Sequence, residues 1–173
     1  MATARLRLVT GKIWLTPVDE RILESLLSVA AAETEPDEVM PPVSAPAGWS
    51  QARREAFREF YRASYGGLTG PTGNQMYAIM SDAGVLGMIR MGRRDEPATV
   101  ETGMWLGQSA RGQGVAVTAL RLLLTEAARV GARVVVAETT ADNGPALGVL
   151  RRCGAVLQPV GDGAVHAEIR LGG

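Results

Sequence analysis

Apolar and polar positions in the first third of the chain predict strand segments followed by two helices. Side chains alternate between apolar and polar over residues 5–9 and 12–14, the period of two that is typical of a half-buried strand. A helix should follow Thr16, which can cap it, with Pro17 and Asp19 in the first turn. Its apolar face follows the helical period and consists of Ile22, Leu23, Leu26, Leu27 and Ala30.

An acidic, proline-rich stretch separates this helix from the next one. Residues 33–48 contain four acidic residues and four prolines. Because proline disfavours the interior of both helices and strands, we expect a long loop here. Ser50 can then cap a second helix with Phe57, Phe60 and Tyr61 at helical spacing, and the glycines between residues 66 and 73 should end it.

The second half of the chain has a more regular pattern. Residues 76–80, 85–91 and 100–106 read as three antiparallel strands joined by polar turns. A helix (115–130), a buried strand (132–137), a second helix (143–153) and two last strands (155–160 and 165–171) follow. The prediction is one α+β domain over residues 1–173, with a mixed, largely antiparallel sheet covered by helices.

Charge and composition exclude several classes of protein. Eighteen basic residues balance eighteen acidic ones, so no global positive field favours nucleic acid or an anionic membrane. A single cysteine, Cys153, and a single histidine, His166, exclude an internal disulfide and a Cys/His zinc site, and we expect no metal. No segment approaches the roughly 20 apolar residues that span a bilayer, and no signal peptide is evident. We therefore expect a cytoplasmic protein.

The most informative segment covers residues 100–117, VETGMWLGQSARGQGVAV, and reads as a strand, a glycine-rich turn and a helix start. Gly112 and Gly114 allow successive backbone N–H groups to face one concavity at a helix N-terminus, which predicts a phosphate site. Three better-known motifs do not fit. A P-loop would need Lys and Ser/Thr at 113 and 114, a dinucleotide fingerprint a glycine at Val117, and a nucleophile elbow a glycine at Arg111.

Three motifs in register resemble the GNAT superfamily of acetyl-CoA-dependent N-acetyltransferases. Residues 111–116, RGQGVA, resemble its R/Q-x-x-G-x-G/A pyrophosphate loop. Residues 101–106, ETGMWL, resemble the E-x-G-x-W-L strand of its ribosomal-protein-acetyltransferase-like branch, and Asn143-x-x-Ala146 resembles its asparagine helix. The chain departs from the pattern at Leu150, where many members have a tyrosine that donates a proton to the departing thiolate.

This resemblance implies acetyl-CoA as cosubstrate and direct attack by an amine on the thioester. The residues that it implies for the cosubstrate are Met104, Trp105, Leu106, Arg111, Gly112, Gln113, Gly114, Val115, Ala116 and Asn143. Since an alkyl amine is mostly protonated at neutral pH, a base is needed. Glu101 is the first candidate and Glu138 the second, and the alternative for each is an ordinary solvated or ion-paired strand carboxylate.

The acceptor is predicted to be a small cationic amine. Clustered carboxylates suit a cation, and in this family the region between the first helices shapes the acceptor pocket, so Glu33, Glu35, Asp37 and Glu38 are expected to bind substrate. The alternative for these four is a solvated acidic loop. Tyr61 and Tyr65 are expected either in the wall of the acceptor pocket or, as their spacing alone predicts, in the core. A faint likeness to aminoglycoside-modifying acetyltransferases, including those acting on kasugamycin, favours an antibiotic acceptor and a role in resistance. The alternatives are acetylation of a protein N-terminus, or a non-catalytic acyl-CoA sensor. A homodimer is a further expectation.

Overall fold

Seven strands form one sheet in this computed structural model, which describes residues 11–172. The strand order is β1-β2-β3-β4-β5-β7-β6, and all neighbours are antiparallel except the parallel pair β4 and β5. The strands are β1 (Ile13–Pro17), β2 (Asn74–Ser81), β3 (Gly84–Arg93), β4 (Thr99–Leu106), β5 (Val134–Thr140), β6 (Val156–Gly161) and β7 (Ala164–Arg170). The predicted mixed, largely antiparallel α+β fold is confirmed.

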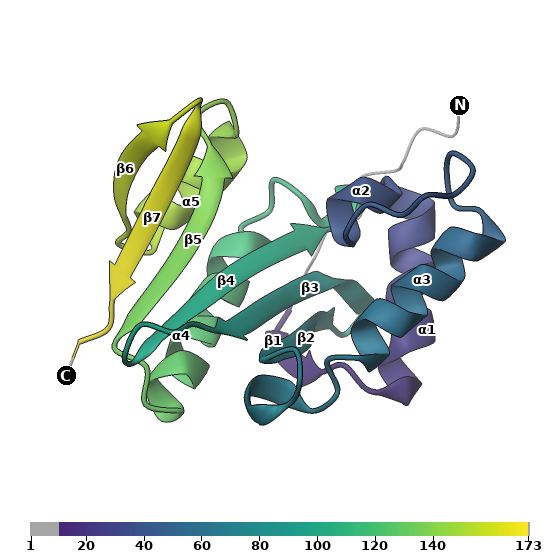
Figure 1. Cartoon of the computed structure of the whole chain (residues 1–173), viewed down its shortest axis with the longest axis horizontal. Helices are drawn as coiled ribbons and strands as arrows, with labels where there is room; N and C mark the ends of the chain where they lie inside the picture. Colours follow the sequence, from purple (N-terminus) through teal and green to yellow (C-terminus); the bar gives the residue numbers. More distant parts are fainter. Residues whose placement is uncertain (1–10, 173) are drawn as a thin grey trace.

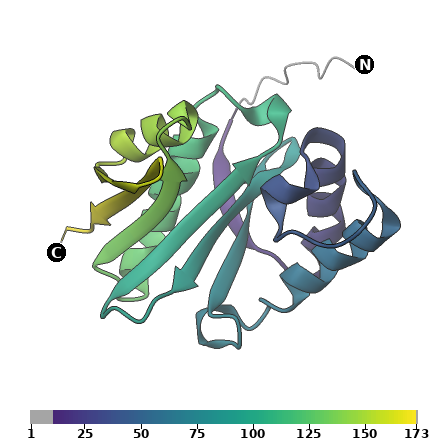
Figure 2. The same ribbon diagram turned by 45° about the horizontal axis from the view of Figure 1, so that its top comes forward.

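Helices cover the sheet on both faces (Figures 1 and 2). One face carries α1 (Glu20–Glu33), α2 (Pro36–Val39) and α3 (Gln51–Arg62), and the other carries α4 (Val115–Arg129) and α5 (Gly144–Arg152). Two single-turn 3-10 helices, η1 (Gly67–Thr69) and η2 (Gln108–Ala110), lie in the connections. Within residues 11–172, no helix is long and apolar enough to cross a membrane.

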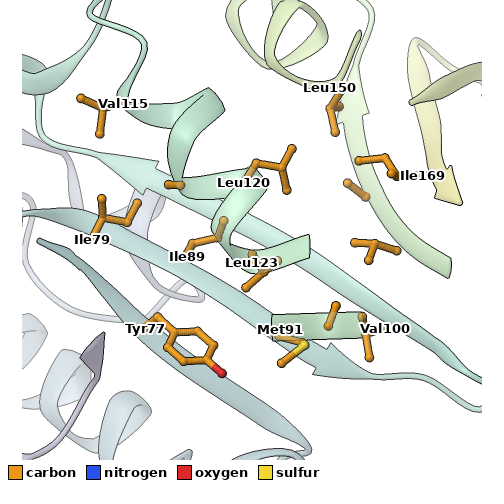
Figure 3. Close-up of a cluster of buried hydrophobic side chains, with 14 of the residues drawn as sticks. Tyr77, Ile79, Ile89, Met91, Val100, Val115, Leu120, Leu123, Leu150 and Ile169 are labelled. Atoms are coloured by element: carbon orange, nitrogen blue, oxygen red, sulfur yellow. The ribbon is translucent and has the colours of Figure 1, made fainter. Parts of the chain in front are cut away.

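Each helical layer packs on its own apolar cluster. On one face Leu120 and Leu123 of α4 lie against Ile79 and Ile89 of the sheet (Figure 3). On the other face the fully buried side chains come from α1 and α3, and they are Leu23, Leu26, Leu27, Phe57 and Tyr61. Strand β4 lies between the two layers, with Val100 and Leu106 in the first cluster and Trp105 in the second.

The first helix begins later than the sequence predicts. Asp19 rather than Thr16 is its N-cap, because Asp19 Oδ1 accepts hydrogen bonds from the N–H groups of Arg21 (2.9 Å) and Ile22 (3.1 Å). Thr16 and Pro17 belong instead to β1, which pairs with β2. The prediction of a cap at Thr16 was therefore wrong. The strand predicted for residues 5–9 lies outside the described residues.

The predicted loop at residues 33–48 contains a short helix, α2, so the exclusion of helix there was wrong. Pro36 occupies its first turn, where a missing N–H costs nothing. The N–H of Glu35 donates to Glu38 Oε2 (2.7 Å), and Trp49 Nε1 anchors the segment by donating to the Thr34 carbonyl (2.8 Å). Residues 36–40 are thereby held over the edge of the sheet face that carries α1 and α3 (Figure 2).

Candidate active site

A first cavity lies where β4 and β5 separate. The two parallel strands pair only through residues 99–101 of β4 and 134–136 of β5, and beyond this point they diverge (Figure 1). The cavity has a volume of about 570 Å³. Besides residues 102–106 of β4 and 137–139 of β5, it is lined by Glu38, Arg111, Ala116, Leu120, Asn143, Pro145, Ala146, Val149 and Leu150. Since the facing edges of both strands lack a strand partner there, their backbone groups are available to a ligand.

The glycine-rich turn forms one end of this cavity. Gly112 and Gly114 have φ angles of +72° and +78°, in the left-handed region that favours glycine. A Cβ on either residue would meet no atom within 4 Å, so the backbone conformation and not crowding requires glycine. Gly114 is the N-cap of α4, whose first N–H groups have no acceptor within the helix. The turn therefore presents amides and a positive helix end to an anion.

Side chains brace the same turn. Arg111 Nε donates to the Leu106 carbonyl (3.0 Å), and Gln113 Nε2 donates to the Ser109 carbonyl (2.8 Å). Arg111 and Ala116 line the cavity, whereas the side chain of Val115 is buried in the core. Asn143 lines the cavity and also caps α5, with its Oδ1 accepting from the Ala146 N–H (3.2 Å). The arrangement fits an elongated ligand with a pyrophosphate at the turn and an amide-containing arm along β4.

A second, smaller cavity adjoins the first. Its volume is about 310 Å³, and it shares Glu38, Gly103, Met104 and Trp105 with the first cavity. Residues 37–41 cover it from the α2 segment, and its other walls are Phe60, Met76, Met88 and Arg90. The sulfur-containing side chains of four methionines give it an adaptable apolar surface, and they are Met40, Met76, Met88 and Met104. Two ligands can therefore meet at β4.

Glu101 is held by two arginines. Its Oε1 accepts from Arg90 (2.6 Å) and its Oε2 accepts from Arg94 (2.9 Å). Burial raises the pKa of Glu101, but the hydrogen bonds and charges of Arg90 and Arg94 outweigh it, so the pKa lies below its ordinary value. Glu101 lines neither cavity. A carboxylate engaged at both oxygens is a weak proton acceptor, and the structure does not place it beside a reacting group.

Glu138 has a different environment. It lines the first cavity from β5, and its Oε1 lies 2.5 Å from His166 Nδ1 on the neighbouring strand β7. The carboxylate is half exposed, whereas the imidazole beside it is mostly covered. Of the two acidic residues that the sequence offered as bases, this is the one at a cavity wall.

The four acidic residues of the α2 region divide into two pairs. Glu33 Oε1 accepts from the Ser109 N–H (2.9 Å), and Glu35 precedes α2 as its N-cap. Neither lines either of the two cavities, and the contact of Glu33 with the Ser109 N–H braces the segment before the glycine-rich turn. Asp37 and Glu38 line the second cavity, with Arg53 and Arg111 each 3.7 Å away. Only this second pair is placed to attract a cation.

The two tyrosines predicted to contact substrate lie elsewhere. Tyr61 is 0% exposed, and its hydroxyl accepts a hydrogen bond from Trp105 Nε1 (3.0 Å). Tyr65 is 41% exposed and donates to Glu20 Oε2 (2.9 Å). Neither lines a cavity. Helical spacing could not decide which way α3 turns its aromatic face, and the structure turns Tyr61 into the core.

Several residues at the cavities were missed by the sequence analysis. Arg90 and the buried methionines occupy ordinary strand or loop positions, so only the packing of α2 and α3 reveals them. Thr102 occupies the variable position of the E-x-G motif. It is buried, it lines the first cavity, and its hydroxyl has no hydrogen-bond partner within residues 11–172.

Comparisons with known proteins agree with this geometry. The acetyltransferase (GNAT) domain family matches residues 12–156. No curated protein matches the sequence significantly. Among solved structures, RimL, the ribosomal L7/L12 α-N-protein acetyltransferase in complex with coenzyme A, superposes with a TM-score of 0.71 at 21% identity, covering 94% of this chain and 96% of RimL.

Two further structures have the same fold. The GNAT domain of S. lividans PAT has a TM-score of 0.72 at 18% identity and covers 99% of this chain and 100% of that one. The microcin C7 self-immunity acetyltransferase MccE, in complex with acetyl-CoA and AMP, has a TM-score of 0.71 at 15% identity over 94% of both chains. With its split strand pair, its glycine turn and this family match over most of its length, the chain belongs to the GNAT family of acetyl-CoA-dependent N-acetyltransferases.

Proposed function

We propose that the protein acetylates a primary amine that binds in the second cavity, and that the amine meets the acetyl group at residues 103–105 of β4. The observation that carries this proposal is the shared wall of the two cavities. Acetyl-CoA supplies an activated acetyl thioester. The first cavity is large enough for its pantetheine arm, and the second is open to a separate ligand, so both substrates can be bound at once.

The chain's own residues then have distinct tasks. The backbone N–H groups of residues 112–116 and the Arg111 guanidinium hold the pyrophosphate. The unpaired edge of β4 at Met104, Trp105 and Leu106 binds the pantetheine amides, and Asn143 borders the arm at the start of α5. Together they fix the position of the thioester before the amine arrives.

Glu138 is our proposed general base. It lines the first cavity, whereas Glu101 is bound to Arg90 and Arg94 and lines neither cavity. The amine proton passes to the Glu138 carboxylate, which becomes a neutral carboxylic acid and later releases the proton to water. The His166 ring, whose Nδ1 lies 2.5 Å from Glu138 Oε1, orients this carboxylate. We assign Glu101 a positioning role, in which its ion pair holds Arg90 at the wall of the second cavity.

The acceptor we propose is a small amine with a cationic and an apolar part. Asp37 and Glu38 attract the positive charge, and the four methionines pack against the rest of the molecule. An aminoglycoside-type antibiotic such as kasugamycin remains the leading candidate, and acetylation would then confer resistance. Because Glu33 and Glu35 do not line the second cavity, it offers a polycation two carboxylates of the α2 region, where the sequence predicted four.

Acetylation of a protein N-terminus is the second candidate. It is favoured by the similarity to RimL, which acetylates the α-amino group of a ribosomal protein, although at 21% identity that similarity shows only the fold. An N-terminal peptide would also present an ammonium group to Asp37 and Glu38 and an apolar side chain to the methionines.

An acceptor panel tests these proposals. Release of free coenzyme A is followed with acetyl-CoA and, in separate reactions, aminoglycosides including kasugamycin, linear polyamines and short peptides with free N-termini. Turnover of an aminoglycoside supports the first candidate, and turnover restricted to peptides supports the second. If acetyl-CoA binds but no amine in the panel is acetylated, the proposal fails and the acyl-CoA sensor becomes the better account.

Two properties of the whole protein belong to the same proposal. We place its action in the cytoplasm, where acetyl-CoA is available. We also propose a homodimer, for which the edge strand β6 offers the exposed side chains of Val156 and Val160. Light scattering on the purified protein measures the mass of the particle directly, and a mass of one chain would contradict the dimer.

A further inference from the structure

A buried hydroxyl at the closed end of the first cavity lacks a protein partner. Thr102 is 6% exposed, and its Oγ1 has no hydrogen-bond partner within residues 11–172. Burying a hydroxyl without a partner is unfavourable, and most buried polar groups in proteins are paired. Thr34 shows the usual solution, because its equally buried Oγ1 donates to the Ala30 carbonyl (2.7 Å).

The position of Thr102 is defined by the split between the strands. It directly follows Glu101, the last β4 residue that pairs with β5, so it lies where the cavity begins. Strand alternation places it on the same face of β4 as Val100 and Leu106, which pack in the cluster under α4. The other cavity residues of this cluster are apolar, and they are Ala137, Leu120 and Leu150. On this face of β4 the hydroxyl is thus surrounded by apolar side chains.

The orientation of the cosubstrate follows from its chemistry and rests on the proposed function. In acetyl-CoA the pyrophosphate and the thioester lie at opposite ends of the pantetheine arm. With the pyrophosphate at the turn of residues 111–116, the thioester reaches the end of the cavity that Thr102 lines. Thr102 is also the chain neighbour of Gly103, at which the two cavities adjoin.

We propose that the Thr102 hydroxyl donates a hydrogen bond to the coenzyme sulfur and stabilises negative charge on that atom during acetyl transfer. The amine nitrogen forms the new C–N bond with its lone pair, the electron pair of the C–S bond stays on sulfur, and the amine proton leaves to the base. Thr102 keeps its own proton, since an aliphatic hydroxyl is far less acidic than a thiol, and the thiolate is later protonated from water. Because hydrogen bonds to charged atoms are stronger than those to neutral ones, the bond favours the charged product side.

Stability measurements on the free protein test the first premise. In Thr102→Val a methyl group replaces the unpaired hydroxyl, so Tm should stay unchanged or rise by about 2–4 °C. In the matched variant Thr34→Val a paired hydroxyl is lost, so Tm should fall by a similar amount. An equal fall in both variants would show that the Thr102 hydroxyl is satisfied without ligand and would overturn the proposal.

Binding measurements test the bond to sulfur without any acceptor. Calorimetry compares coenzyme A with desulfo-coenzyme A between pH 7 and pH 9.5. In the wild type the preference for coenzyme A should grow about tenfold with pH, because lowering the pKa of the bound thiol by about one unit gives that factor. Thr102→Val should lose most of this growth, and Thr102→Ser, which retains the hydroxyl, should keep it. The same pH dependence in the wild type and Thr102→Val would contradict the assignment.

Turnover completes the test once an acceptor is known. Thr102→Val should lower kcat about tenfold with little change in the KM for acetyl-CoA, and Thr102→Ser should restore most of the rate. An unchanged kcat in Thr102→Val would overturn the role of Thr102 while leaving the acetyltransferase proposal intact. A wild type that binds neither coenzyme A nor acetyl-CoA would instead refute the proposed function, and this inference with it.

Discussion

The two cavities that adjoin at β4 differ in whether backbone or side chains shape them. The first depends mainly on the backbone, through the separation of β4 from β5 and the left-handed glycines before α4. The second depends on side chains, with carboxylates of the α2 segment at its cover and methionines on its walls. Backbone geometry can be common to proteins of very different sequence, as the low identities of the structural neighbours illustrate. On our proposal the first cavity therefore holds the coenzyme common to the family, and the second holds the acceptor particular to this protein.

The largest effect should come from Glu138, the proposed general base in the wall of the first cavity. Glu138→Gln removes the proposed proton acceptor and should lower kcat by about 10²-fold, the size expected for a lost general base, with the Kd for acetyl-CoA within about twofold of the wild type. Glu168→Gln is the matched control, since Glu168 lies on β7 and lines neither cavity. Equal activity of the Glu138 and Glu168 variants would transfer the base role away from Glu138.

The backbone origin of the first cavity can be tested at a single glycine. In Gly114→Ala the alanine must adopt a φ near +78°, which costs about 1–2 kcal/mol. The free variant therefore relaxes to another backbone conformation at this turn, and coenzyme binding has to restore the original one. We expect coenzyme A affinity to fall about tenfold by calorimetry. Gly148→Ala in the interior of α5, where the added Cβ meets nothing within 4 Å, should leave the affinity unchanged and raise Tm slightly. A tight Gly114→Ala complex would show that the turn does not bind the coenzyme.

Glu101 should prove more important for stability than for proton transfer. Glu101→Gln breaks the ion pairs with Arg90 and Arg94 and should lower the free energy of unfolding by about 1–2 kcal/mol at pH 7. Because the folded-state pKa lies below its ordinary value of 4.5, this stabilisation is present above pH 4.5 and is lost as pH falls through the folded-state pKa.

Urea unfolding of both proteins at a series of pH values measures this dependence. The difference in unfolding free energy between the wild type and Glu101→Gln should be largest near neutral pH and shrink in acid. A drop in kcat of about 10²-fold for Glu101→Gln with a normal unfolding midpoint would contradict our assignment and return the base role to Glu101.

The smallest effect should come from the cover of the second cavity. Asp37 is exposed and partly balanced by Arg53 at 3.7 Å, so Asp37→Asn should raise the KM for a cationic acceptor only about two- to threefold. The effect should fade at high salt and leave the KM for acetyl-CoA unchanged. Asp162→Asn, in the exposed turn between β6 and β7, serves as a control for the loss of one negative charge. Identical KM values in both variants would remove Asp37 from acceptor binding.

The sequence predicted the secondary structure around the first cavity better than that of the segments around the second cavity. The strands and helices after residue 74 were predicted within a few residues, because their apolar periods are long and end at glycines or polar turns. The cap at Thr16 and the unbroken loop at 33–48 were wrong. In both places a local hydrogen bond decided the structure: the Ile22 N–H donates to Asp19 Oδ1 in the first turn of α1, and the Glu35 N–H donates to Glu38 Oε2.

The sequence by itself determined the order of strands and helices and the glycine-rich turn, because strand alternation, helix starts and glycine spacing are local properties. The resemblance of three motifs, in order, to the GNAT superfamily correctly predicted the family that the domain match shows. Only the tertiary structure decided which acidic residues line a cavity. Glu101 and Glu138 look alike in a strand pattern, yet the first lies between two arginines and the second lines a cavity beside His166. The side chains that surround a carboxylate come from strands and helices far apart in the chain, and no local pattern encodes that arrangement.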